Sequence, residues 1–366
     1  MKKTLIALAA LAAAGATLAQ SSVTIYGRMD LGMSSVETTT DTDAATEEFS
    51  LAGAEGTRTG SRLGFRGTED LGGGLRAGFV YEIGINADRT DMFGDSPDNN
   101  AQTRLANLSL SGGFGTVVIG TFMNAFDTAR DFSPATDNVP GGDFTQFHGA
   151  ATLERFDSRQ QNAIAYVSPA FSGFTFSAGV FNEEHTAAGE TQRKYDGYIV
   201  GLNYSQGPLA AQFAFGNLDV SNHAPLSYAI TAGASTTALD NAEVQNWALG
   251  VRYTLPQVVL SFIYEDSEQS NVSGVLREFN AWELGARFPM GAFAPYITYG
   301  QGEITTAADP VTNRDNDTSA WQIGTTYNLS ARTWVYAAFG EFQRDNQDGT
   351  NRTKHDGYAI GLVHTF

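Results

Sequence analysis

The chain has 366 residues, a formal net charge of −18 and no cysteine. The acidic balance argues against nucleic acid as a partner, because nucleic-acid binding relies on basic side chains that neutralise phosphates. The lack of cysteine excludes a small secreted domain held together by disulfides. An aromatic content of 11% and 40 glycines, against 10 prolines, favour strands joined by tight turns over helices.

The start of the chain has the pattern of a secretory signal peptide. Two lysines precede an apolar run over residues 5–14, and small residues follow up to Ala19. We therefore expect a signal peptide over residues 1–19 and an exported domain over residues 20–366. A membrane-anchoring helix is the alternative, but the run is too short to cross ~30 Å of hydrocarbon.

Beyond this segment, apolar and polar residues alternate in stretches of strand length. Residues 23–33, 247–255 and 282–288 each place apolar side chains on one face and polar or charged side chains on the other. A soluble β-sandwich would show the same alternation, so the pattern alone does not choose between the two architectures.

The spacing of the turns distinguishes these architectures. Seven short connections rich in Gly, Pro or Ser are flanked by alternating residues, which is typical of hairpins; they are 69–74, 111–115, 168–173, 205–208, 255–257, 289–291 and 329–332. Long polar stretches separate them, namely 34–58, 87–101, 121–160, 183–194, 217–244, 266–277, 302–317 and 343–354. Short turns on one side, long loops on the other and sixteen strands predict an all-β, antiparallel transmembrane barrel.

The last strand, about 354–366, ends on an aromatic residue with no polar tail. In a closed barrel this strand pairs with the first, because an open edge in lipid would leave backbone groups unpaired. Side chains of one parity are therefore expected to face lipid; they are Tyr358, Ile360, Leu362, His364 and Phe366.

Four segments of the chain are similar to a known family. Residues 22–27, 61–72, 108–115 and 361–366 resemble the general diffusion porins of beta-proteobacteria. The resemblance implies a homotrimer of sixteen-stranded barrels in which the third extracellular loop folds into each lumen. It also implies that the barrel-assembly machinery reads Phe366 as an assembly signal.

The longest polar stretch, 121–160, is the expected third loop. Loops of this length without regular structure are usually functional or disordered. It carries six phenylalanines, which we expect to pack against the inner wall: Phe122, Phe126, Phe132, Phe144, Phe147 and Phe156. A loop that lies over the mouth or contacts a neighbouring molecule is the alternative.

Basic residues fall on the lumen face of the first strands: Arg28, Arg62, Arg66 and Arg76. The resemblance implies a pore constriction with Arg62, Arg104 and Arg159 on its basic side and Glu82 as an acidic neighbour. Acidic residues of the 121–160 loop, Asp127 and Asp131 among them, would face this cluster.

Two observations complicate this assignment. Arg104 shares the parity of outward residues, so it points inward only if a bulge intervenes. The family often has Gly-Arg where this chain has Gly120-Thr121, so one basic group is absent. The alternative for each arginine is a solvated lumen residue with no special role.

The sequence thus predicts a cell outer-membrane porin for passive diffusion of ions and small hydrophilic solutes. It predicts weak to moderate anion preference at high salt, which drifts toward cations as salt falls. It predicts no enzyme activity, cofactor or metal centre, because the five histidines have no metal-ligand spacing. A substrate-specific channel and an outer-membrane enzyme are the alternatives. Outer-membrane lipid and lipopolysaccharide are expected partners, and calcium binding by acidic loops is left open.

The subunit contact is expected on the first five strands and the last. Gly27, Gly64 and Gly78 would allow close approach there, and residues 87–101 would reach a neighbour.

Overall fold

The computed structural model describes residues 22–40, 45–51, 60–85, 103–136, 139–142, 144, 147, 156, 159–185, 193–221, 242–271, 274–306, 316–346 and 352–366. The expected signal peptide over 1–19 and the stretch 87–101 lie outside these residues. Within them, no helix is long and apolar enough to cross a membrane.

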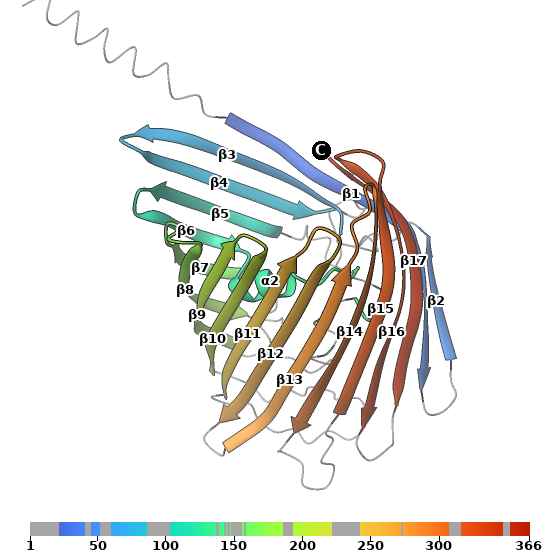
Figure 1. Cartoon of the computed structure of the whole chain (residues 1–366). Coiled ribbons are helices and arrows are strands. Elements are labelled where there is room, and N and C mark those ends of the chain that lie inside the picture. Colours follow the sequence, from blue (N-terminus) through green and yellow to red (C-terminus); the bar gives the residue numbers. More distant parts are fainter. Residues whose placement is uncertain are drawn as a thin grey trace, which may run out of the picture.

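The chain forms one antiparallel sheet (Figure 1). Its strands are β1 Ser22–Thr40, β2 Ala45–Leu51, β3 Arg62–Gly72, β4 Leu75–Gly84, β5 Thr103–Gly112, β6 Gly115–Phe122, β7 Gln160–Val167, β8 Phe174–His185, β9 Arg193–Gln206, β10 Leu209–Ser221, β11 Ala242–Thr254, β12 Val259–Asn271, β13 Gly274–Arg287, β14 Phe293–Thr306, β15 Asn316–Asn328, β16 Thr333–Asn346 and β17 Thr353–Thr365.

The sheet closes into a sixteen-stranded barrel. β3 pairs with β1 over Ser22–Arg28, and β2 pairs with the same edge of β1 further along. β2 and β3 therefore share one position in the wall. β17 pairs with the other edge of β1, from Arg28 to Thr40, and this ladder closes the barrel.

The terminal residue completes this seam. The Phe366 N–H donates to the Gly27 carbonyl at 3.1 Å, and the Gly27 N–H donates to the Phe366 carbonyl at 3.1 Å. A Cβ at position 27 would lie 2.4 Å from the Phe366 ring, so the ring packs directly over this glycine.

The seven tight turns predicted from the sequence are confirmed by the hairpin ladders on either side of them. The long-loop boundaries were wrong in places. Residues 34–40 continue β1 and residues 45–51 form β2, although both belong to the predicted loop 34–58. Glu47 and Asp317 likewise lie on strands. Backbone pairing continues past the apolar band because it does not require apolar side chains.

The two faces of the wall differ as the alternation predicted. On β17, Tyr358, Ile360 and Leu362 are exposed, whereas Ala359 and Val363 are fully buried. On β1, the most exposed apolar side chains are Val23 and Ile25. We call the face with exposed apolar side chains the outer face and the opposite one the inner face.

The expected role of the N-terminal glycines in subunit contact needs correction. Gly64 lies under the ring of Tyr26, and Gly78 lies against the Ser109 hydroxyl. Both glycines share the parity of inner-face residues, so they cannot bring a neighbouring subunit closer. Their function is to make room for side chains of the same chain.

One short helix, α2 Ala125–Arg130, follows β6. Asn124 caps it, since its side-chain oxygen accepts from the backbone N–H groups of Phe126 and Asp127. The Asp127 carboxylate accepts in return from the Asn124 backbone N–H, which completes a capping box. α2 packs on β9, β10 and β11.

Candidate functional site

Glu82 on β4 is the centre of a basic cluster. Its carboxylate is almost fully buried, and its Oε1 accepts a hydrogen bond from the Arg104 Nε at 2.8 Å. The Arg62 Nη1 lies 3.7 Å from the same oxygen, and the Tyr26 hydroxyl donates to the other oxygen at 3.1 Å. One carboxylate therefore orders two guanidinium groups from neighbouring strands.

A β-bulge brings Arg104 to this carboxylate. Glu82 is opposite Leu105, whereas the next residue, Ile83, is opposite Thr103. Arg104 is the extra residue between these pairs, so its side chain departs from the strict alternation of β5. The condition set by the sequence, a bulge next to Arg104, is met.

The other predicted basic residues surround this pair. Arg28 is directly opposite Arg62 in the β1–β3 ladder. Arg28, Arg104 and Arg159 are all close enough to repel the Arg62 guanidinium electrostatically. Arg66 stacks on the Tyr26 ring, with its Cζ 5.0 Å from the ring centroid, and so adjoins the cluster through Tyr26.

Of the two predicted acidic residues, Asp127 lies in α2 and Asp131 directly follows its last residue. Asp127 uses one carboxylate oxygen for the capping box. Asp131 is the C-cap residue and keeps exposed surface, yet nearby protein dehydrates its carboxyl group. This desolvation raises the pKa of Asp131 above its usual value, and the positive charge of Arg62 partly opposes the rise. Asp131 and the basic cluster therefore act on each other electrostatically.

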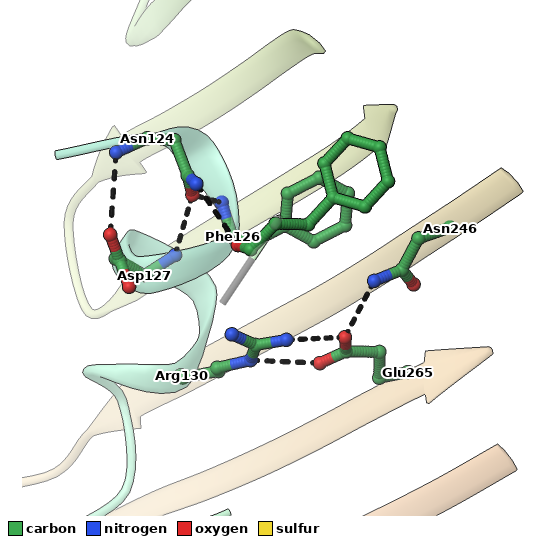
Figure 2. A network of polar contacts seen from close by, with 7 residues as sticks. Asn124, Phe126, Asp127, Arg130, Asn246 and Glu265 are labelled. Carbon is green, nitrogen blue, oxygen red and sulfur yellow. Dashed lines mark hydrogen bonds and ion pairs between the residues drawn. The ribbon is translucent and has the colours of Figure 1, made fainter. Parts of the chain in front are cut away.

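A buried ion pair holds α2 to the wall (Figure 2). Arg130 donates from Nε to Glu265 Oε2 at 2.9 Å, and its Nη2 donates to Glu265 Oε1. The Asn246 side-chain amide donates to the same Oε1 at 2.8 Å. Glu265 is fully buried on the inner face of β12, so its charge depends on these partners.

A second set of hydrogen bonds holds the chain after α2. The Thr136 N–H donates to the Gln322 side-chain oxygen at 2.7 Å, and the Tyr296 hydroxyl donates to that oxygen at 2.6 Å. The Gln322 amide donates back to the Thr136 carbonyl at 3.1 Å. Further along, the Pro140 carbonyl lies so close to Gly340 that a Cβ there would be 1.9 Å away. β14, β15 and β16 thus all contact this segment.

Five of the six phenylalanines pack against the wall as expected, whereas Phe122 is the last residue of β6 and belongs to the wall itself. Phe126 and Phe156 share a cluster with inner-face residues of β8 to β11, and Phe122 packs at its edge. Phe144 and Phe147 lie in a second cluster with residues of β12 to β16. Phe132 is buried under Arg252, whose Cζ lies 4.8 Å from its ring centroid.

Sequence reasoning did not find the anchoring residues Glu265, Asn246 and Gln322. A signal was present on β12, since Glu265 falls on the inner parity beside apolar Ile263. The capping box of α2 was also readable as Asn124 followed three residues later by Asp127. Several charged residues of the 121–160 loop lie outside the described residues: Asp137, Asp143, Glu154, Arg155 and Asp157.

Comparisons with known proteins agree on one family. A family model described as Gram-negative porin matches residues 4–347. The chain is 32% identical over 396 aligned positions to outer membrane porin protein 32 of Delftia acidovorans, and the alignment covers all of both chains. It is 27% identical to an outer membrane porin of Bordetella pertussis, again over both full lengths.

Solved structures show the same fold. An anion-selective porin from Comamonas acidovorans superposes with a TM-score of 0.71 and 24% identity, covering 95% of this chain and all of that one. An in-vitro folded outer membrane protein of Vibrio cholerae, described in a trimer form, superposes with a TM-score of 0.63 and 16% identity, covering 94% and 99% of the two chains.

Proposed function

The chain belongs to the Gram-negative porin family, and from this membership we propose how its barrel selects the solutes that cross it. The protein is an outer-membrane porin, whose closed barrel forms a water-filled channel for passive diffusion of ions and small hydrophilic solutes. A sixteen-stranded barrel is wide enough for such a channel. Selectivity must then arise where the channel narrows.

The narrow part is the space between residues 125–136 of the loop and the basic cluster. The segment folds into the lumen, because its anchors lie on the inner faces of β11, β12, β14 and β15. Most of the basic cluster lies on β1, β3, β4 and β5, across the barrel from β11 and β12, and Arg159 directly precedes β7. The coupling between Asp131 and Arg62 supports this facing arrangement.

The constriction carries a field transverse to the channel. Arg28, Arg62, Arg104 and Arg159 supply its positive side, and Asp127 and Asp131 its negative side. Such a field orients water and polar solutes and raises the barrier for apolar ones. The low-dielectric wall concentrates it in the lumen.

The cluster favours anions, because Glu82 is one carboxylate among several guanidinium groups. This excess of guanidinium groups over carboxylates is the main observation behind the proposed anion preference. In a KCl gradient at high salt, the channel is expected to show weak to moderate anion preference. The variant Arg62→Ala plus Arg159→Ala is expected to lose it, whereas Arg76→Ala, nearer the β3–β4 turn, is expected to retain it.

Varying the salt concentration distinguishes the effect of the basic cluster on ion preference from the effect of the acidic surface. The Debye length is ~3 Å at 1 M salt and ~30 Å at 0.01 M, so low salt extends the reach of carboxylates at the long-loop end. The reversal potential should drift toward cations as salt falls. A cation preference at high salt that the arginine variants do not change would contradict the proposed constriction.

Assembly follows the same family pattern. A homotrimer embedded in outer-membrane lipid and lipopolysaccharide, formed after removal of residues 1–19, is the functional unit. The barrel-assembly machinery recognises the strand that ends in Phe366. The 32% identity to a porin over its full length supports these assignments.

A further inference from the structure

A recess lies between the start of α2 and the inner face of the wall. Its volume is about 380 Å³, and it is mostly apolar. The floor comes from β7 and β8, where four small residues face α2: Ala163, Ala165, Ser177 and Gly179. Phe122, at the end of β6 beside β7, also lines it, as do Met123 and Ala125 at the start of the loop. Phe181 and Ile199 line it as well.

The small floor residues explain why this space is unfilled. Elsewhere the loop meets the wall through phenylalanine rings, as in the cluster of Phe126, Phe156 and Phe181. An apolar cavity of ~150 Å³ is already able to bind benzene, so the recess has room for a ring with a substituent.

The amide side chains of Asn124, Asn203 and Gln212 beside the recess have partners within the protein. The Asn124 side chain donates to the Phe156 carbonyl and accepts from the start of α2. The Asn203 amide donates to the Gln212 side chain, which itself donates to the Phe213 carbonyl. The recess therefore favours an apolar group rather than one that needs several hydrogen bonds.

The positive charge of Arg159, the residue before Gln160, favours a ligand that also carries a negative group. Gln160 lines the recess, and the preceding residue is Arg159. Arg159 belongs to the basic cluster through its repulsion of Arg62. A solute drawn to this cluster by a negative group can place an apolar body in the recess.

We propose that the recess is a binding subsite for small aromatic monocarboxylates, with the ring between α2 and the β7–β8 floor and the carboxylate toward Arg159. The proposal rests on the channel function proposed above. Ring burial adds affinity that a short aliphatic acid lacks, since apolar area removed from water contributes ~25 cal/mol per Å². Such solutes would occupy the channel longer than inorganic anions do.

The test is current block in planar bilayers containing the purified channel. Benzoate, acetate and benzylammonium are each added at constant KCl concentration. Benzoate is expected to reduce the current saturably, whereas acetate and benzylammonium are not. The variant Ala165→Leu plus Ser177→Leu fills the recess and should raise the half-blocking benzoate concentration about tenfold, which corresponds to ~1.4 kcal/mol of lost binding. Ala210→Leu, the same substitution as at Ala165 but on the inner face of β10 outside the recess, should not.

Three results would overturn the subsite: no more block by benzoate than by acetate, equal block by benzylammonium, or unchanged benzoate block in the filled variant. If the double variant fails to assemble, Ala165→Val supplies a smaller addition and should still raise the half-blocking concentration. A channel that conducts KCl with anion preference but is not blocked by benzoate refutes the subsite alone. A chain that forms no channel refutes the proposed function itself.

Discussion

At the scale of single residues, the site depends on how few carboxylates accompany its arginines. Glu82 accepts hydrogen bonds from Arg104 and Tyr26, so its negative charge mainly positions the side chains of the cluster. Asp131 differs, because it keeps exposed surface and makes its contribution at longer range. Its protonation state is therefore the one that changes the balance of charge without dismantling the cluster.

Acidification should strengthen anion preference through Asp131. Desolvation raises the pKa of this carboxyl group, so it gains a proton at a higher pH than an ordinary aspartate does. As pH falls from 7, one negative charge opposite Arg62 is lost and the reversal potential should shift toward the anion value. Asp131→Asn should show that shift already at pH 7 and respond less to acid.

The control is Glu69→Gln, at the β3–β4 turn and away from the cluster. The reversal potential of this variant should depend on pH as it does in the unchanged protein. A pH response identical in the Asp131→Asn channel and the unchanged one would mean that another group sets it.

At the scale of elements, α2 is held to the wall by the buried Arg130–Glu265 ion pair, and the loss of either partner is strongly destabilising. Glu265 is fully buried, and Arg130 is nearly so. Removing one member of a buried pair typically costs about 3–5 kcal/mol, because a charge is left without its partner. Replacing both members with apolar residues of similar size is often tolerated.

Arg130→Met should therefore release α2 from the wall, whereas Arg130→Met plus Glu265→Leu should restore much of the loss. Current noise in single channels reports movement of the segment, and thermal unfolding in detergent reports stability. Lys354→Met is the matched control, because it removes an exposed pair with Glu341, and such pairs contribute no more than about 1 kcal/mol. Equal noise in all three variants would show that Arg130 does not hold the helix.

The limits of prediction from the sequence are visible in these same elements. The hairpins were predictable, because alternation and turn residues are local signals. The Arg130–Glu265 pair joins residues 135 positions apart, so no local pattern points to it. The bulge at Arg104 depends on the register between β4 and β5, which neither strand specifies alone. The arginines were found through resemblance and parity, whereas Tyr26 was missed, although it shares the inner parity of Arg28.

At the scale of the whole molecule, one set of strands contacts the 121–160 segment and another set carries most of the basic cluster. The strands from β8 to β16 contact the described residues of the 121–160 segment through phenylalanine clusters and buried polar groups. The strands β1, β3, β4 and β5 hold the basic cluster, and β1 is also where the wall closes. The seam between β1 and β17 is therefore close to the site, since Arg28 is opposite Thr365.

Deleting Phe366 should weaken this seam and lower the yield of folded trimer. The deletion removes two backbone hydrogen bonds to Gly27 and the ring that covers it. Gly27→Val keeps the terminal phenylalanine but places a side chain against its ring and against the Arg62 backbone carbonyl. It therefore disturbs β1 at the seam and beside β3 without removing the assembly signal. Heat-modifiability on gels, with chains folded both in cells and in detergent, measures assembly. The control is Phe171→Ala, which removes an aromatic side chain that is 80% exposed at the β7–β8 turn.

The two variants separate packing from recognition. If the seam alone matters, both should fold poorly in cells and in detergent. If the assembly machinery also reads Phe366, the deletion should lose more trimer in cells than Gly27→Val does, while the two behave alike in detergent. Normal heat-modifiable trimers from the deleted chain in both settings would contradict both roles, and the barrel would then have to close without its last residue.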